Sequence, residues 1–339
     1  MDSSHKQILI AGAGGFIGSH LVQYALDHGW AVWASVRSTT SREFLSDPRI
    51  HFIELPYSDP QELRSALLEH KTERGPWDVI INNMGVTKTN DVRDFERVNY
   101  GNVQRLVEAL KLTEMLPSQF ILMNSLSAWG PVHEKDNLPI SLSDTPHPNT
   151  AYGLSKLHVA SWMKQQDDVP WTIFYPTGVY GPREKDYYLM WKSVKAGFDF
   201  VPGFKTQHLS FVYVKDLVEA IFRSIDLGKV HREYIVAEPH THTSSDFRRC
   251  IRQSLAKPRC LSLRVPLWLL KAVNYTAGWL AARAGHPSTL NADKYHLMAQ
   301  RNWQADISVM QEELGYTPGT TLEEGVGLTT AWYKENNWI

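Results

Sequence analysis

The sequence contains little cysteine and no run of like charges. Its two cysteines, Cys250 and Cys260, match no metal-binding or redox spacing, so we expect free thiols in a reducing cytosol, with a disulfide as the alternative. The formal net charge is −1 and no basic block is present, so we do not expect a nucleic-acid partner. The histidines are scattered, and His240 and His242 have too few nearby cysteines or carboxylates to predict a metal site.

Long apolar runs are also missing. The most apolar stretch, residues 265–284, is interrupted by Lys271 and Asn274, so we do not expect a membrane span. This stretch predicts a core or lid helix, with contact to a membrane surface as the alternative. The first residues, 1–5, lack the basic and apolar regions of a secretory signal, so we expect a cytoplasmic protein.

The chain does contain short apolar runs that alternate with helical patterns. Hydrophobic residues make up 43% of it and charged residues 21%, which is enough for a sizeable core. The expected strands are residues 8–10, 31–36, 51–53, 79–81, 120–123, 171–175 and 234–236, and the expected helices are 18–28, 60–70, 91–112 and 150–165. Alternation of this kind predicts βαβ units and a parallel sheet covered on both faces. We therefore predict an α/β fold, a Rossmann-type doubly wound parallel sheet with a smaller, mostly helical C-terminal substrate domain.

The regular alternation weakens after residue 176, which indicates that the chain crosses between two domains. We expect a nucleotide-binding domain of residues 1–178 with 209–237. The substrate-binding domain is then formed by residues 179–208 with 238–339.

Three glycines follow the first expected strand directly. Gly12, Gly15 and Gly18 have the spacing Gly-x-x-Gly-x-x-Gly between a strand and a helix. Glycines here permit a tight turn and close approach of a pyrophosphate, which the helix N-terminus attracts. The pattern predicts a dinucleotide site, and a purely structural turn is the alternative.

The end of the second expected strand lacks an acidic residue. A carboxylate at this position would bind the ribose 2′-hydroxyl of NAD. The sequence has Val36 followed by Arg37 and Ser38, with Arg42 nearby, and a guanidinium there can hold the 2′-phosphate of NADP. We favour NADP over NAD, and a solvated arginine at a strand end is the alternative.

Tyr152 and Lys156 lie four residues apart on an expected helix, so their side chains share one face. A neighbouring ammonium lowers the pKa of a tyrosine, which can then exchange a proton with a substrate oxygen. Ser125 ends the strand that precedes this helix, where ligands gather in open α/β sheets, so it can hydrogen-bond the same oxygen. A Tyr-x-x-x-Lys pair alone is common. Here it indicates a catalytic site because Ser125 and the glycine turn accompany it.

Together these motifs resemble the extended short-chain dehydrogenase/reductase family, also called the NAD-dependent epimerase/dehydratase family. The segments that resemble it are residues 12–18, 98–103, 124–131, 175–183, 210–216, 303–318 and 322–325. Trp129 stands where a tyrosine is usual, and Ser127 is a weaker candidate than Ser125 for the catalytic serine. The resemblance is compatible with a homodimer.

The resemblance implies roles for individual residues. Catalysis is assigned to Ser125, Tyr152 and Lys156, and Lys156 also contacts the nicotinamide ribose. The implied cofactor-binding residues are Gly12, Gly15, Phe16, Ile17, Gly18, Arg37, Ser38, Glu54, Leu55, Met84, Gly85, Val86, Asn99, Tyr152, Lys156, Tyr175, Pro176, Thr177 and Val179. The implied substrate-binding residues are Thr87, Ser127, Trp129, Tyr180, Arg183 and His208.

Departures from the family pattern narrow the expected substrate. Members that act on nucleotide sugars usually have an arginine where this chain has Leu209, although Arg183 could replace it. Arg37 resembles the dihydroflavonol-reductase and cinnamoyl-reductase branches, which use NADPH, and the apolar residues 265–279 resemble the hydroxysteroid-dehydrogenase branch more loosely. We predict an oxidoreductase that interconverts a carbonyl and an alcohol on a small hydrophobic substrate. The alternatives are a nucleotide-sugar epimerase or dehydratase with tightly bound NAD, and a non-enzymatic cofactor-binding sensor.

Overall fold

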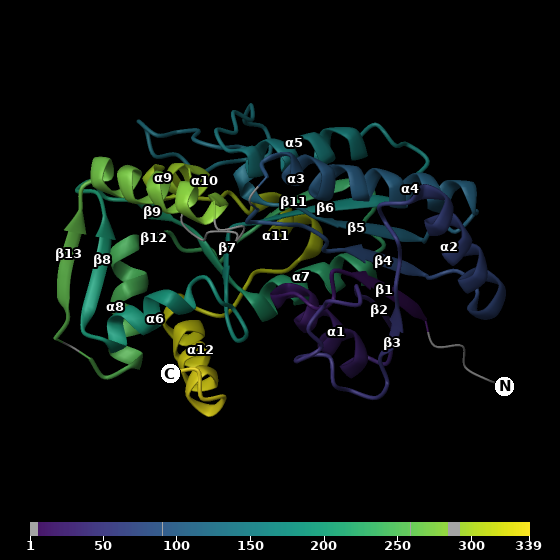
Figure 1. The fold of residues 1–339 in the computed structure, drawn as a ribbon, viewed down its shortest axis with the longest axis horizontal. Coiled ribbons are helices and arrows are strands. Elements are labelled where there is room, and N and C mark those ends of the chain that lie inside the picture. The colour runs from purple at the N-terminus through teal and green to yellow at the C-terminus, as the bar shows by residue number, and fades with distance from the viewer. Residues whose placement is uncertain (1–5, 90, 258, 284–291) are drawn as a thin grey trace.

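The computed structural model describes residues 6–89, 91–257, 259–283 and 292–339 (Figure 1). The expectation for residues 1–5, and the end of the apolar stretch at residue 284, lie outside these ranges. A single large parallel sheet forms the centre of the N-terminal part, and helices lie on both of its faces (Figure 1).

The sheet has seven strands, all paired in parallel, in the order β11-β6-β5-β4-β1-β2-β3. The strands are β1 (Gln7–Ala11), β2 (Ala31–Ser35), β3 (His51–Ile53), β4 (Val79–Asn82), β5 (Gln119–Met123), β6 (Trp171–Pro176) and β11 (Arg232–Val236). Each matches an expected strand within two residues. The inner strands β4, β5 and β6 are buried along their whole length, because a parallel sheet covered on both faces leaves no side to solvent.

The covering helices pack on the two faces in separate groups. One group comprises α2 (Pro60–Arg74), α3 (Arg93–Glu96), α4 (Asn102–Leu112) and α5 (Ala151–Met163), and the other includes α1 (Phe16–Asp27) and α7 (Val214–Asp226) (Figure 1). The fold is therefore the predicted α/β doubly wound type. The strand order reverses between β1 and β4, so the connections that leave the carboxyl ends of these two strands run in opposite directions. Open α/β sheets bind their ligands at such a position.

One expected helix is irregular. The segment 91–112 forms α3, then a π-helical turn at Arg97–Gly101, then α4. Hydrophobic periodicity does not reveal such a turn, because the side chain that the turn buries is polar. The turn contains the buried Asn99, whose contacts are described below.

A second hydrophobic core lies beside the sheet. It is built from α6 (Tyr188–Lys195), α8 (Ser244–Ser254), α12 (Leu322–Glu335), β7 (Gly178–Tyr180) and β10 (Phe211–Tyr213). Phe211 and Phe247 stack at its centre, with ring centroids 4.7 Å apart. Phe211 lies in a segment expected in the nucleotide-binding domain, while Val212 beside it belongs to the core of the large sheet. The two cores thus meet at β10, and the domain boundaries stay a prediction.

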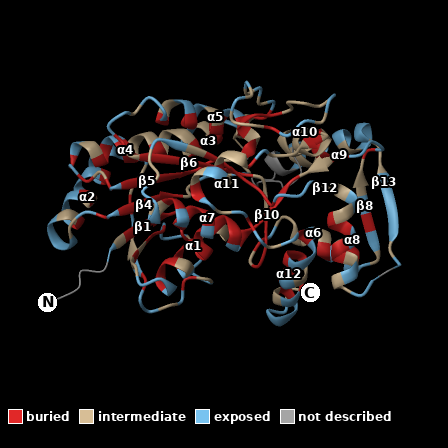
Figure 2. Cartoon of the chain, turned by 180° about the vertical axis from the view of Figure 1, so that it is seen from behind, coloured by how far each residue is buried: buried red, intermediate tan, exposed pale blue. Residues whose placement is uncertain are grey.

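The C-terminal part contains more strand than its sequence pattern indicates. β8 (Phe198–Pro202) pairs with β13 (Leu261–Val265), and β9 (His208–Leu209) pairs with β12 (His242–Thr243) and β14 (Asn302–Trp303). The remaining helices are α9 (Leu267–Arg283), α10 (Ala292–Ala299) and α11 (Ser308–Leu314). Most of β13 is exposed, so it lacks the apolar run that marks a buried strand (Figure 2). Within the described part of the chain, every helix is too short or too polar to cross a membrane.

Candidate active site

The glycine turn follows β1 and leads into α1. Gly12 has φ +79°, and a Cβ there would lie 2.6 Å from the carbonyl oxygen of Asn83. A Cβ at Gly18 would lie 2.2 Å from the carbonyl oxygen of Gly12, so helix and turn approach each other more closely than any side chain allows. The exposed Gly15 is the N-cap of α1 and provides no capping side chain, which leaves the first N–H groups of the helix open to an anion. Phe16 and Ile17 form its first turn, half-buried. The turn therefore fits the pyrophosphate of a dinucleotide.

The loop after β2 carries the residues expected to discriminate between the two nicotinamide cofactors. Arg37 and Ser38 are exposed, and the backbone N–H of Ser38 donates to a carboxylate oxygen of Glu54 at 3.2 Å. Leu55 is buried behind this carboxylate. The Arg42 guanidinium lies over the ring of Phe52, 4.2 Å from its centroid. Arg37 and Arg42 thus lie in this loop, and Glu54, which follows β3, accepts the backbone hydrogen bond of Ser38.

Tyr152 and Lys156 both lie on α5, which Thr150 caps by accepting the N–H of Gly153 at 3.0 Å. The Lys156 ammonium is buried, donates to the carbonyl oxygen of Met123 at 3.0 Å, and lies 5.9 Å from the Tyr152 ring centroid. A Cβ at Gly85 would lie 3.6 Å from the same ammonium. The ammonium is therefore held between the end of β5 and the loop after β4.

The electrostatics differ from the sequence-based expectation for Tyr152. Burial raises the pKa of its phenol, and a hydrogen bond with the Ser125 hydroxyl opposes that increase. Burial also lowers the pKa of Lys156 to about 8. The expected lowering of the Tyr152 pKa is therefore wrong for this structure, because desolvation outweighs the hydrogen bond with Ser125. The phenol is protonated at neutral pH and can donate a proton.

Ser125 stands at the carboxyl end of β5, as expected. Its Oγ donates to the Ser127 Oγ at 3.1 Å and accepts the backbone N–H of Ser127 at 3.2 Å. The side chain of Asn124 accepts the backbone N–H of Ser125 and donates to the carbonyl oxygen of Lys156. The structure thus brings Ser125, Ser127, Tyr152 and Lys156 together.

Asn99 fixes the loop that follows β4. Its Oδ1 accepts the N–H of Val86 at 2.7 Å, and its Nδ2 donates to the carbonyl oxygen of Val86 at 3.1 Å. Nδ2 also donates to the Oγ of Ser155 at 3.0 Å, and that hydroxyl donates to the carbonyl oxygen of Tyr152. This network joins the predicted cofactor residues of the loop to the helix of Tyr152. Met84 and Gly85 lie in the same loop, half-buried and exposed, and Thr87 is exposed beside them.

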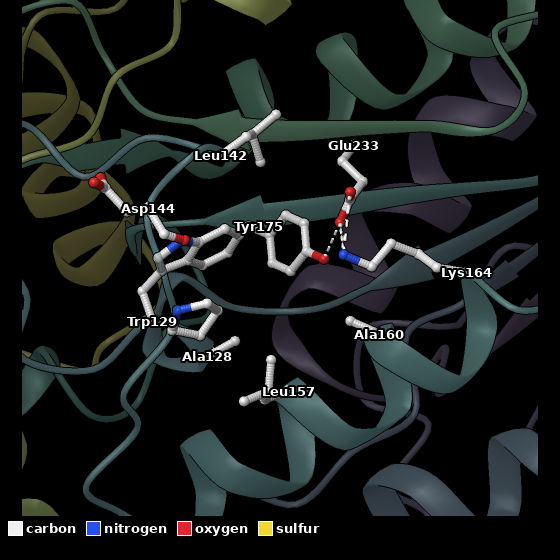
Figure 3. A pocket seen from close by; sticks show the side chains of 10 residues that line it. Ala128, Trp129, Leu142, Asp144, Leu157, Ala160, Lys164, Tyr175 and Glu233 are labelled. Atoms are coloured by element: carbon white, nitrogen blue, oxygen red, sulfur yellow. Dashed lines mark hydrogen bonds and ion pairs between the residues drawn. The ribbon is translucent and has the colours of Figure 1, made fainter.

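Trp129 and Tyr175 point into a separate cavity of about 90 Å³ between α5 and β6, which Ser125, Tyr152 and Lys156 do not line (Figure 3). Their rings are perpendicular, with centroids 4.7 Å apart. Trp129 Nε1 donates to the carbonyl oxygen of Asp144, and the Tyr175 hydroxyl donates to Glu233 at 2.5 Å. Direct contact of these two side chains with substrate or cofactor stays a prediction.

Four further expected residues lie between the end of β6 and the end of β7, and their surroundings differ from one to the next. Pro176 is buried at the strand end, the Thr177 N–H donates to the carbonyl oxygen of Val236, and Val179 is half-buried on β7. Tyr180 is 1% exposed, and its hydroxyl has no partner within the second core.

The last two expected substrate residues lie apart from each other. The Arg183 guanidinium lies 5.1 Å from the ring centroid of Phe44, on the nucleotide side, and one of its buried nitrogens has no partner. His208, half-buried on β9, donates its backbone N–H to Arg301.

Asp293 is a site residue that the sequence patterns do not reveal. From α10, its carboxylate accepts the backbone N–H of Tyr152 at 3.1 Å. No local signal marks a contact between residues 141 positions apart. Asn124, by contrast, adjoins Ser125 at a strand end, and that position could have identified it. Among the described residues, no three metal-ligating side chains lie close enough together to hold an ion.

Residues 8–237 match the model of the NAD dependent epimerase/dehydratase family. A ceramide reductase from Caulobacter vibrioides is 24% identical over 336 residues, covering 98% of this chain and 96% of that protein. A UDP-glucose 4-epimerase from Vibrio cholerae is 25% identical over 344 residues, covering 98% and 97%.

Solved structures show the same fold. The UDP-glucose 4-epimerase of Thermotoga maritima with UDP-glucose superposes with a TM-score of 0.76 at 18% identity, covering 98% of this chain and 99% of that chain. A dTDP-glucose 4,6-dehydratase from Bacillus anthracis in complex with NAD gives 0.75 at 19% identity, covering 98% of both chains. Because the family model spans more than half of the sequence, this chain belongs to the NAD-dependent epimerase/dehydratase family of extended short-chain dehydrogenases/reductases and is an enzyme of that family. An NAD(P) cofactor is typical of the family.

Proposed function

We propose that the enzyme interconverts a carbonyl and an alcohol on a small hydrophobic substrate, with NADP as its preferred cofactor. The observation that carries this proposal is the placement of the Tyr152 phenol beside the hydroxyl of Ser125 and the buried ammonium of Lys156. A substrate oxygen placed between the two hydroxyls would receive both hydrogen bonds.

The chain's own residues supply the acid–base part of the reaction. Nicotinamide, when bound, supplies or accepts the hydride. In the direction of reduction, Tyr152 donates its proton to the carbonyl oxygen as negative charge develops there, and Ser125 orients that oxygen. Lys156 stabilises the phenolate that remains, and its charge acts strongly because the ammonium is buried. The raised pKa of Tyr152 favours this direction, since the phenol begins protonated.

A hydrophobic substrate is supported by two observations. Leu209, half-buried on β9, offers no charge to a diphosphate at the position where nucleotide-sugar enzymes usually have arginine. The relative from Caulobacter vibrioides is named a ceramide reductase, and a ceramide is a hydrophobic molecule.

NADP preference is supported by the loop after β2. The exposed Arg37 can approach a 2′-phosphate from the end of the strand. Glu54, the carboxylate that follows β3, already accepts the backbone N–H of Ser38.

A nucleotide-sugar epimerase or dehydratase is the second candidate. Several relatives and solved structures carry such names, and Arg183 has a buried nitrogen without a partner that a phosphate could accept from. Arg183 nevertheless lies against Phe44 in the loop after β2, so a phosphate there would belong more naturally to the dinucleotide.

Replacing Tyr152 with Phe tests the first proposal. We expect Y152F to lower turnover of NADPH with hydrophobic ketones by at least about 100-fold, because the proton donor is lost. NADPH affinity should stay within about twofold of wild type. Tyr100→Phe is the control, since that ring packs against Trp162. Retained activity in Y152F would refute the assignment, and turnover of UDP- or dTDP-sugars but of no hydrophobic ketone would favour the second candidate.

A further inference from the structure

Helix α9 exposes most of its apolar side chains. Trp268 is 71% exposed, Leu280 58% and Trp279 55%. Only Asn274 is fully buried among its residues whose side chains are described. A helix that is apolar on nearly all sides is normally enclosed by protein or lipid, so this exposure requires a covering partner.

The paired strands β8 and β13 extend the same apolar surface. The large exposed side chains on these strands and on the turn after β8 are Phe198, Phe200, Phe204, Leu261 and Leu263. The rings of Phe198 and Phe200 stack, and a Cβ at Gly203 would lie 3.3 Å from Leu267 at the start of α9. Both views place α9, β8 and β13 at the same end of the molecule (Figures 1 and 2). We call α9 with β8 and β13 the end surface.

The part of the sequence that contains β13 and α9 is basic and lacks acidic residues, whereas β8 contains the buried Asp199. Residues 247–292 include eight arginines or lysines and no aspartate or glutamate, although the whole chain has a net charge of −1. Three of the eight pair with Asp199 or Asp246. The ion pairs of the described residues include none of the other five, which are Lys257, Arg259, Arg264, Lys271 and Arg283.

Two of these cations lie beside the exposed rings. The Arg283 guanidinium is 3.8 Å from the ring centroid of Trp279, and Lys271 Nζ is 5.6 Å from that of Tyr275. Aromatic rings flanked by cations are typical of helices that lie in the headgroup region of a bilayer, with rings toward the acyl chains and cations near phosphates.

We propose that the end surface docks on a bilayer that contains anionic lipid, with α9 lying in the interface without crossing it. Apolar side chains supply the contact with acyl chains, and the unpaired cations supply attraction to anionic headgroups. A second copy of the chain is a poorer partner, because pairing two end surfaces would bring their positive charges together.

The end surface is joined to the candidate active site through α10. Tyr275 of α9 packs against Tyr295 of α10 with ring centroids 6.3 Å apart, and Asp293 of α10 accepts the N–H of Tyr152. In the docked state, α10 would therefore lie between α9 at the bilayer and α5. A hydrophobic substrate could then pass from lipid to Tyr152 without entering bulk water.

Vesicle sedimentation tests the docking without cofactor or turnover, so its result is independent of the proposed reaction. The intact chain is mixed with vesicles of phosphatidylcholine, or of phosphatidylcholine with about 30% phosphatidylglycerol, at about 0.1 M and about 1 M salt. The test variants are W268S/W279S and K271E/R283E. The matched controls are Leu112→Ser, at a side chain 63% exposed on α4, and Lys135→Glu, at another exposed lysine.

We expect the wild type and both controls to bind anionic vesicles at low salt and to dissociate at high salt. Each test variant should lose at least about tenfold in partition coefficient. Absence of binding by the wild type, or undiminished binding by the test variants, would overturn the proposal. A fall in molar mass from two chains to one in both test variants, measured by light scattering, would instead identify the end surface as a protein interface.

Discussion

The carboxylate of Asp293 accepts a hydrogen bond from the backbone N–H of Tyr152, 3.1 Å away and 141 residues earlier in the chain. The contact attaches α10 to the first turn of α5, where a carboxylate is favoured by the helix dipole. The position of the general acid proposed here thus depends on a residue from the C-terminal part of the chain.

Replacing Asp293 with Ala should release α10 from α5. We expect the unfolding free energy to fall by about 1 kcal/mol, as for loss of a helix-capping group. We also expect KM to rise more than kcat falls, because Tyr152 and Lys156 stay on the same helix. Steady-state kinetics and denaturant unfolding measure the two effects. Asp293→Asn keeps an acceptor oxygen and should restore most of the loss, whereas a D293A enzyme with unchanged KM and stability would show that the contact is dispensable.

Replacing Arg37 with Ser should change cofactor preference. We expect Kd for NADPH to rise by about 10- to 100-fold, because a charge-assisted contact with the 2′-phosphate is lost, while Kd for NADH stays nearly constant. Fluorescence titration measures both constants, and Arg64→Ser, at an exposed position on α2, is the control. Equal weakening of both cofactors would mean that Arg37 does not distinguish them.

Replacing Lys156 with Met should inactivate the enzyme but stabilise the fold. Burial lowers the pKa of Lys156 to about 8, so holding its charge at pH 7 costs about 3 kcal/mol of folding free energy. Losing the hydrogen bond to Met123 costs about 1 kcal/mol, which leaves a net gain of about 2 kcal/mol.

The size of this effect depends on pH. Between pH 8 and the ordinary lysine pKa of 10.5, the unfolded chain holds a proton that the folded chain has lost, so wild-type stability rises with pH. The advantage of K156M should therefore shrink from pH 7 to pH 9 in denaturant titrations. A K156M protein less stable than wild type at pH 7 would contradict the cost assigned to the buried ammonium.

Replacing His20 with Gln should reduce sensitivity to acid. Burial lowers the pKa of His20 to about 4, and its Nε2 contacts the carbonyl oxygen of Pro182 at 3.0 Å. Between pH 6.5 and pH 4 the unfolded chain is protonated at this residue and the folded chain is not, so stability falls as pH falls. From pH 7 to pH 5 this loss is about 2 kcal/mol. H20Q should lack that part of the loss in urea titrations, while His240→Gln, at an exposed position, should keep it. An identical acid profile for H20Q and wild type would rule out this contribution.

The sheet and the residues around Tyr152 could be predicted because their signals are local. Buried strands such as β4 are short apolar runs, and Ser125 was found because it ends one of them. The π-helical turn around Asn99 gave no such signal, since the residue that the turn buries is polar.

Long-range placement could not be read from the sequence in the same way. The pattern did not show that Trp129 and Tyr175 face each other in their own cavity, or that Asp293 reaches Tyr152. The pairing of β13 with β8 was also missed, because an exposed strand lacks a buried face to impose period-two alternation. The basic character of residues 247–292 is present in the sequence, but its charges are spaced among apolar residues and form no consecutive run.

The side chain of Asn99 makes the two backbone hydrogen bonds with Val86 that a neighbouring strand would make. Its amide presents one acceptor to the N–H of Val86 and one donor to the C=O, the pair that a peptide group offers across a ladder. One edge of the loop after β4 is thus completed by a single residue from a widened helical turn. The sheet need not extend to hold this loop.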